Sequence, residues 1–183
     1  SARLWFEALA LPLSAQEFLA ERRALIRSLR PTAQPMPGAL ALTQRLHQAG
    51  VPQAIATSSS RDPFAWKAEP HQAWLACFQA IVLSDDPAVG GRSKPAPDLF
   101  LVAADRLGYD PADCLVLEDS PAGIAAAEAA GMRSIAIPDP LVDRSLYQAA
   151  AAILPDLTAF DPVAWGLLPT TSEPVDPRAS TTE

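Results

Sequence analysis

The chain has 183 residues, 49% of them hydrophobic and 19% charged, so it can bury one sizeable core and a small accessory module but not two full domains. A net charge of −7 repels nucleic-acid backbones and anionic membrane surfaces at long range, so we expect neither as a partner. No stretch is apolar enough to span a bilayer, and the first residues lack the basic start and cleavage site of a signal peptide. Cys77 and Cys114 lie in apolar surroundings, so we expect a cytoplasmic protein with reduced thiols.

The first 35 residues are predicted to be helical. Apolar residues at positions 4, 5 and 9 share one helix face and no cap precedes them, so we expect the sequence to begin inside a helix. The segment Ser14-Ala-Gln-Glu17 has the form of a capping box and predicts a second helix that runs to about Arg30. Prolines at positions 31, 35 and 37 would end this helix.

Helices and strands alternate from residue 36 to residue 167. Helices are predicted at 38–50, 97–108 and 120–130, and strands at 51–57, 78–83, 114–117, 134–138 and 152–154. This βαβ alternation predicts an α/β fold with a mostly parallel sheet, covered by helices on both faces. The segment 168–183 has almost no apolar residues, and we expect it to be disordered.

Polar side chains follow three of the predicted strands. Hydroxyl residues occupy positions 57–59, Lys94 lies in the loop after the second strand, and Glu118 and Asp119 follow the third. In open parallel sheets, ligands bind at the edge formed by the carboxyl ends of the strands. Hydroxyls, an ammonium group and two carboxylates at one edge are the groups that a phosphate ester with a divalent cation requires.

Taken one at a time, these clusters have ordinary structural explanations. Residues 57–60 could be a polar turn, Lys94 a solvated loop residue, and Asp119 or Ser120 only the N-cap of the helix that begins at Pro121. The carboxylate pair fits such an explanation less well. Two carboxylates about 5 Å apart repel by roughly 3 kcal/mol at an effective dielectric constant of about 20, so a buried pair needs a cation or a shared proton.

The order of these segments resembles that of a known superfamily. The runs AIATSSS, SKPAPDLFLVAA and CLVLEDSPAGIAAAEAAGM resemble the second, third and fourth signature motifs of the haloacid dehalogenase superfamily, and the resemblance covers residues 36–138. By this resemblance, Thr57 and Ser58 would bind the phosphoryl group. Lys94 would neutralise that group and serve with Thr57 in catalysis, and Glu118 and Asp119 would bind Mg²⁺.

Two further segments, IVLSDDPAVGGRSKPAPD and AWGLLP, look similar to the branch of the superfamily that contains pseudouridine-5′-phosphatases and β-phosphoglucomutases. Members of this branch carry an N-terminal helical cap, and ALPLSAQEFLAERR resembles the second half of such a cap. The first motif of the superfamily, an Asp-x-Asp signature that supplies the nucleophile from the central strand, is absent upstream of Thr57. The sequence is therefore expected to be N-terminally truncated.

The resemblance implies a Rossmann-like parallel sheet that lacks its central first strand. We expect a partial helical cap at 1–35, an α/β core at 36–167 and a tail at 168–183. The function implied is that of a Mg²⁺-dependent phosphomonoester hydrolase acting on a small phosphorylated metabolite, with pseudouridine 5′-phosphate as a candidate.

An aspartate outside this sequence would attack phosphorus, so this chain alone is expected to be inactive, and the completed protein to be a monomer. Two alternatives remain open. One is a sugar phosphomutase of the same superfamily, which would share every residue named above. The other is a non-catalytic remnant, or a subunit that folds only with a partner that supplies the missing strand.

Overall fold

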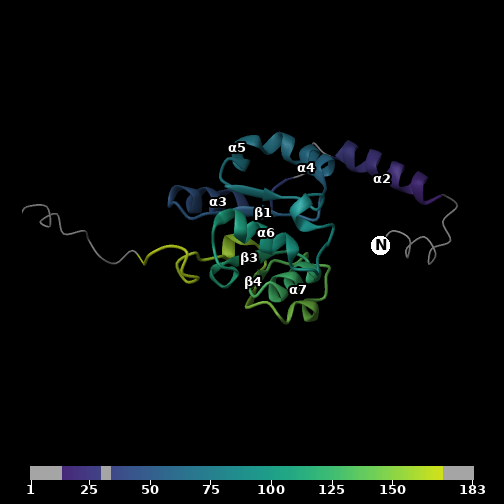
Figure 1. Cartoon of the computed structure of the whole chain (residues 1–183). Coiled ribbons are helices and arrows are strands. Elements are labelled where there is room, and N and C mark those ends of the chain that lie inside the picture. The colour runs from purple at the N-terminus through teal and green to yellow at the C-terminus, as the bar shows by residue number, and fades with distance from the viewer. Residues whose placement is uncertain (1–13, 30–33, 171–183) are drawn as a thin grey trace, which may run out of the picture.

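The computed structural model describes residues 14–29 and 34–170 (Figure 1). The expected first helix and most of the tail lie outside these residues. The described helices are α2 (Ala15–Leu29), α3 (Ala39–Gln48), α4 (Arg61–Ala68), α5 (Gln72–Leu75), α6 (Asp98–Leu107) and α7 (Pro121–Ala129). The strands are β1 (Ala54–Ala56), β2 (Ala80–Val82), β3 (Leu115–Glu118), β4 (Arg133–Ala136) and β5 (Ala152–Ile153). Short 3-10 helices include η3 (Pro87–Val89), η5 (Arg144–Tyr147) and η6 (Leu157–Ala159).

Helix α2 begins at the predicted capping box. The Ser14 hydroxyl accepts a hydrogen bond from the Glu17 amide at 3.2 Å, and the Glu17 carboxylate accepts one from the Ser14 amide at 2.7 Å. These bonds satisfy amides at the helix start that would otherwise lack partners. One end of the helix contacts α4, and the rest extends to one side of the α/β body (Figure 1).

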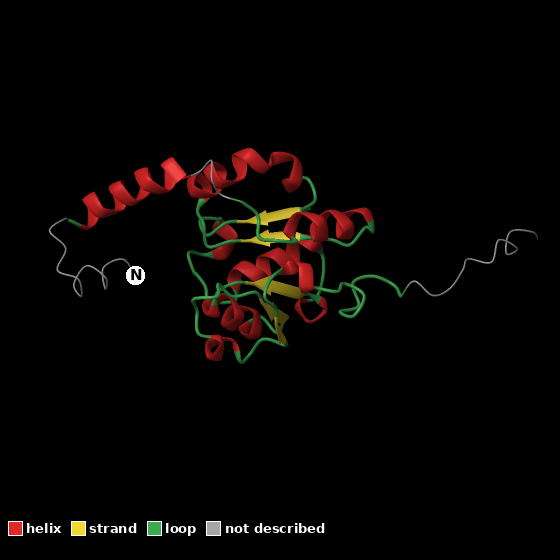
Figure 2. Ribbon diagram, turned by 180° about the vertical axis from the view of Figure 1, so that it is seen from behind, coloured by secondary structure: helices red, strands yellow, loops and turns green. Residues whose placement is uncertain are grey.

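All five described strands run parallel, but they form two separate groups (Figure 2). Strand β1 pairs with β2, and β3, β4 and β5 pair in that order. No backbone pairing joins β1 to β3 within the described residues. The predicted α/β class and the parallel strand direction are therefore confirmed, with the sheet divided between its first and third strands.

We call the edges of β1 and β3 that face each other the inner edges. The hydrogen bonds on the opposite edges show which backbone groups point to these inner edges. Backbone groups of Gln53 and Thr57 bond toward β2, and that of Glu118 bonds toward β4. Because successive residues of a parallel strand point to opposite edges, the backbone groups of Ala56 and Leu117 point into the space between the two groups of strands. Within the described residues, the inner edges of β1 and β3 are therefore open.

Apolar side chains cover both faces of the strands. On one face, Leu42 and Leu46 of α3 pack with Ile135, Ile137 and segments near the C-terminus. On the other face, α6, α7 and the strands meet in a cluster of small and apolar residues: Phe100, Ala104, Val116, Ala126, Ala127, Ala130 and Met132. Helix α6 also contacts β1 and β2, so it spans both groups of strands.

Several elements differ from the prediction, including β2, which covers Ala80–Val82 rather than residues 78–83. Strand β1 is three residues long rather than seven, and Pro52, which has no amide hydrogen to donate, precedes it. The segment 61–75 contains α4 and α5, which the sequence pattern does not indicate. Helix α4 has no clear apolar stripe, and its one fully buried residue is Ala68, so its hydrophobic periodicity is weak.

Candidate active site

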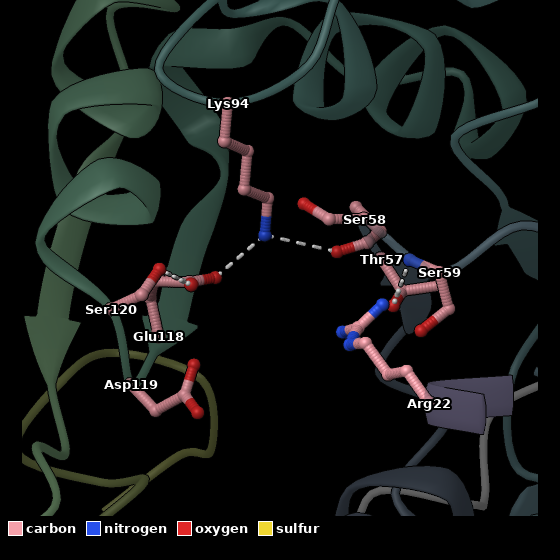
Figure 3. A pocket seen from close by; sticks show the side chains of 9 residues that line it. Arg22, Thr57, Ser58, Ser59, Lys94, Glu118, Asp119 and Ser120 are labelled. Carbon is pink, nitrogen blue, oxygen red and sulfur yellow. Dashed lines mark hydrogen bonds and ion pairs between the residues drawn. The ribbon is translucent and has the colours of Figure 1, made fainter. Parts of the chain in front are cut away.

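The polar residues predicted at the strand ends line one pocket of about 440 Å³ (Figure 3). Residues 56–59 enter it from the end of β1, and residues 118–120 from the end of β3. Lys94 reaches it from the loop between η3 and α6, and Arg22 from α2. The three segments predicted from the sequence therefore meet where the sheet topology predicts that they should, and Arg22 joins them from a fourth segment.

Lys94 is a buried ion-pair residue. Its amine lies 2.8 Å from Glu118 Oε2, and the side chains of Lys94 and Glu118 are only 8% and 9% exposed. The amine also donates to the Ala56 carbonyl oxygen at 3.1 Å and lies 4.5 Å from the centre of the Phe100 ring. These contacts exclude the alternative that Lys94 is a solvated loop residue.

Glu118 is held at both carboxylate oxygens. Oε2 accepts from Lys94, and Oε1 accepts from the Ser120 hydroxyl at 2.7 Å. The same Ser120 oxygen accepts from the Gly123 amide at 3.0 Å, which makes Ser120 the N-cap of α7. The Ser120 side chain therefore has two roles: it caps the start of α7 and it orients Glu118.

Asp119 does not cap the helix. Its side chain is exposed to the pocket, and within the described part of the chain its carboxylate has no hydrogen-bond or ion-pair partner (Figure 3). Its carbonyl oxygen accepts from the hydroxyl of the fully buried Tyr147 at 2.6 Å, which fixes the backbone at this position. Burial, followed by the charges of Asp119 and Glu118, raises the pKa of Tyr147, so its hydroxyl keeps its proton at neutral pH.

The hydroxyl residues after β1 form a turn and also face the pocket. The Thr57 hydroxyl accepts from the Ser59 amide at 3.1 Å, so the predicted polar turn is present. Lys67 of α4 donates to the Ser59 hydroxyl at 2.7 Å. The Ser58 side chain is exposed, and among the described residues its hydroxyl has no partner, which leaves it free to donate to a ligand.

Arg22 is a pocket residue that the sequence pattern does not reveal. It lies on the exposed surface of α2, and its guanidinium group points toward the hydroxyls that follow β1 (Figure 3). Lys94 is paired with Glu118, so Arg22 is the cation without an ionic partner among the described residues that line this pocket. An amphipathic pattern identifies helix faces but does not indicate which exposed residue faces a site on another segment.

The two cationic and two anionic side chains that line the pocket balance in formal charge. A phosphate ester would add about two negative charges, which a divalent cation would offset. The described residues contain no group of three or more His, Cys, Asp and Glu that could hold a metal by themselves. Mg²⁺ commonly uses only one or two carboxylates, with phosphate oxygens and water as its other ligands, and the free carboxylate of Asp119 fits this pattern.

A profile of haloacid dehalogenase-like hydrolases matches residues 2–131. The chain belongs to this family. The match contains the first two motif segments and all but the last residue of the third, so it confirms the resemblance noted in the sequence. No helix in the described residues is long and apolar enough to cross a membrane.

Curated relatives of this family member include named phosphatases. The chain is 41% identical over 160 residues to "(DL)-glycerol-3-phosphatase 2" of Arabidopsis thaliana, covering 86% of this chain and 66% of the relative. It is 42% identical over 170 residues to "Probable pseudouridine-5'-phosphatase" of Drosophila melanogaster, covering 91% and 73%. The chain thus spans about two thirds to three quarters of the length of these two relatives.

Solved structures of the family share the fold. A hydrolase of Deinococcus radiodurans, solved with bound phosphate and sodium, is 33% identical with a TM-score of 0.65, over 73% of this chain and 61% of that one. A family hydrolase of Entamoeba histolytica has a TM-score of 0.73 over 87% of this chain and 74% of that one, at 24% identity. The predicted Rossmann-like fold of the family is therefore confirmed.

Proposed function

We propose that this chain carries the phosphate-binding and metal-binding residues of a Mg²⁺-dependent phosphomonoesterase for a small phosphorylated metabolite. The observation that carries the proposal is the buried amine of Lys94, held at one pocket with the free Ser58 hydroxyl and the free Asp119 carboxylate. An ammonium group held by a carboxylate at a strand end can neutralise an anion without having to reorganise.

Each pocket residue has a distinct role in this proposal. The hydroxyls of Thr57 and Ser58 donate to phosphoryl oxygens, and Lys94 offsets the charge that develops on them. Glu118 holds the Lys94 amine in place, whereas Asp119 is the residue that would hold Mg²⁺. The metal would supply further charge neutralisation at the phosphoryl oxygens. Glu118 could join Asp119 at the metal by giving up one of its two hydrogen bonds.

We propose that none of the described residues that line the pocket serves as the nucleophile. Thr57 has no histidine or lysine bonded to its hydroxyl, and the Glu118 carboxylate is paired at both oxygens. Ser59 is bonded to Lys67, but the lysine donates to its hydroxyl and does not accept from it. If Asp119 holds the metal, no carboxylate of the pocket remains to attack phosphorus. We therefore expect the chain to bind phosphate but not to hydrolyse phosphate esters.

The relatives support the substrate class rather than one compound. Both named relatives are phosphatases of small hydroxylated molecules, a glycerol phosphate in one case and a nucleoside phosphate in the other. The Deinococcus hydrolase was solved with phosphate bound. A phosphate monoester with a small, polar leaving group is therefore the class that we propose, with pseudouridine 5′-phosphate and glycerol 3-phosphate as the first compounds to compare.

Calorimetric titration of the 183-residue chain with inorganic phosphate in the presence of Mg²⁺ tests this proposal. We expect saturable binding that Lys94→Met weakens at least about tenfold, because the charge at the pocket is lost. Arg45→Gln, on the exposed side of α3, removes a positive charge away from the pocket and should leave the affinity unchanged. Failure of the wild-type chain to bind phosphate would contradict the proposal.

The same chain should show no Mg²⁺-dependent hydrolysis of p-nitrophenyl phosphate at high protein concentration. The assay needs Lys94→Ala as a control, because a contaminating phosphatase would survive that substitution. Turnover by the wild-type chain that disappears in Lys94→Ala would show that a nucleophile is present in this chain after all. Competition of the two phosphate esters with inorganic phosphate then ranks the candidate substrates.

A further inference from the structure

Gly123 lies in the first half of α7, where the helix itself gives no reason for a glycine. Its backbone is not among the positive-φ glycines, so an ordinary L-residue could adopt its conformation. Apart from proline, glycine is the least favourable residue in a helix interior, and most other positions of this helix are alanine. The reason for glycine must therefore lie in what surrounds it.

The space beside Gly123 is filled by the side chain of Glu118. A Cβ atom built at Gly123 would overlap Cγ, Cδ and Oε1 of this glutamate. Gly123 is buried, and the Glu118 side chain is 9% exposed. The glutamate thus lies against the backbone of α7, at a distance that only a residue without Cβ permits.

Glu118 cannot move aside without losing its partners. Lys94 donates to one of its oxygens at 2.8 Å, and Ser120 donates to the other at 2.7 Å. A rotation that cleared a new methyl group would break at least one of these bonds. A flexible surface side chain would relax at little cost, but a carboxylate bonded at both oxygens would not.

We propose that Gly123 is a positioning residue, whose missing Cβ makes the space in which Glu118 holds Lys94 at the pocket. Gly123 is not among the residues that line the pocket. It acts through Glu118 on the location of the Lys94 amine. The packing relationship is independent of the function proposed above, whereas its effect on phosphate binding rests on that function.

Thermal unfolding of Gly123→Ala in two backgrounds tests the packing relationship. In the wild-type background we expect the Tm to fall by at least about 3 °C, because the methyl group displaces Glu118. In the Glu118→Ala background the clash is gone, and the same substitution should leave the Tm unchanged or raise it, since alanine favours the helix. Equal Tm changes in the two backgrounds would overturn the proposal.

Two further variants keep this test decisive. Glu118→Ala leaves the Lys94 amine without its counter-ion, so a second background, Glu118→Ala with Lys94→Met, removes both charges in case the first background does not fold. Ala122→Ser serves as the matched control, because it adds one heavy atom at an exposed position of the same helix. It should shift the Tm equally in every background.

Phosphate binding separates positioning from a purely structural role. Gly123→Ala should weaken binding of inorganic phosphate at least about fivefold, and adding Glu118→Asp, which shortens the side chain, should restore part of the affinity. Unchanged phosphate affinity in a folded Gly123→Ala chain would reject the positioning role. If the wild-type chain binds no phosphate, the proposed function fails, and the two-background Tm comparison alone decides the role of Gly123.

Discussion

The amine of Lys94 lies 2.8 Å from Glu118 Oε2 at the end of β3 and 3.1 Å from the carbonyl oxygen of Ala56 at the end of β1. One side chain therefore joins the ends of two strands that share no backbone hydrogen bonds. The Ala56 carbonyl belongs to the open inner edge of β1, so Lys94 also satisfies an acceptor that the sheet itself leaves unpaired.

The pair of Lys94 and Glu118 should show strong coupling in a double-mutant cycle. Lys94→Met and Glu118→Gln should each lower the free energy of unfolding by about 2 kcal/mol or more, because each leaves one charge without its partner at a poorly solvated position. The double substitution should cost less than the sum of the two. Urea unfolding followed by tryptophan fluorescence measures all four forms, and strict additivity would mean that the ion pair contributes little.

Asp119→Asn should weaken Mg²⁺ binding while leaving thermal stability nearly unchanged, because the carboxylate has no partner in the described part of the chain. Ser120→Ala is the comparison. It removes the N-cap of α7 and should lower stability by about 1 kcal/mol. Calorimetric titration with Mg²⁺ in the presence of phosphate, together with thermal unfolding, separates the two effects. Unchanged Mg²⁺ affinity in Asp119→Asn would make the metal assignment wrong.

Arg22→Gln should lower the affinity for inorganic phosphate roughly three- to tenfold, since it removes the unpaired positive charge from the pocket lining. Stability should not change, because the side chain is exposed. The effect should shrink as the salt concentration rises, as expected for a solvent-accessible charge. Arg45→Gln is the control, and equal responses of the two variants would indicate only a general effect of net charge.

Amide hydrogen exchange should alternate along β1 and β3. The amides of Ala56 and Leu117 face the open inner edges, whereas those of Ile55 and Val116 lie in the ladders with β2 and β4. We expect the inner-edge amides to exchange at least about a hundredfold faster, because no described residue accepts a hydrogen bond from them. Equal protection of neighbouring residues would show that the inner edges are paired in solution.

Tyr147→Phe should destabilise the fold by about 1–2 kcal/mol, because it leaves the Asp119 carbonyl oxygen without its donor. Burial raises the pKa of Tyr147 in the folded state. The protonated hydroxyl therefore makes its full contribution to stability below the unfolded pKa of about 10, and this contribution is lost as the pH rises through the folded pKa. Tyr147→Phe should thus lose less stability than wild type above about pH 10, while Tyr109→Phe, at an exposed tyrosine, should behave like wild type.

Much of the fold could be predicted from local sequence patterns, because known physical rules connect each pattern to one type of structure. The reciprocal bonds of Ser14 and Glu17 start α2 where the capping box predicts it, and the apolar runs before Thr57 and Glu118 become parallel strands. Parallel strands bring their carboxyl ends to one edge, so the meeting of the hydroxyls, Lys94 and the carboxylates is also predictable.

The remaining features depend on relationships that no local pattern contains. Arg22 reaches the pocket because one end of α2 contacts α4, and Tyr147 supports Asp119 from a segment 28 residues away. Gly123 can be interpreted only once the rotamer of Glu118 is known. The sequence could not decide whether Asp119 or Ser120 is the N-cap of α7, since either residue type is a good cap. The structure decides it, because the Ser120 side chain accepts from the Gly123 amide.

Helix α6 packs against both groups of strands and so connects the two parts of the divided sheet. Its residues pack on β1 and β2 through Leu99 and Ala103, and toward β3 and α7 through Phe100 and Ala104. Within the described residues, the two groups of strands are therefore held together by side-chain contacts and by the ion pair of Lys94 and Glu118, not by backbone hydrogen bonds. We therefore expect the two groups of strands to slide past each other more easily than strands joined by backbone hydrogen bonds, and such sliding would change the spacing of the strand ends that line the pocket.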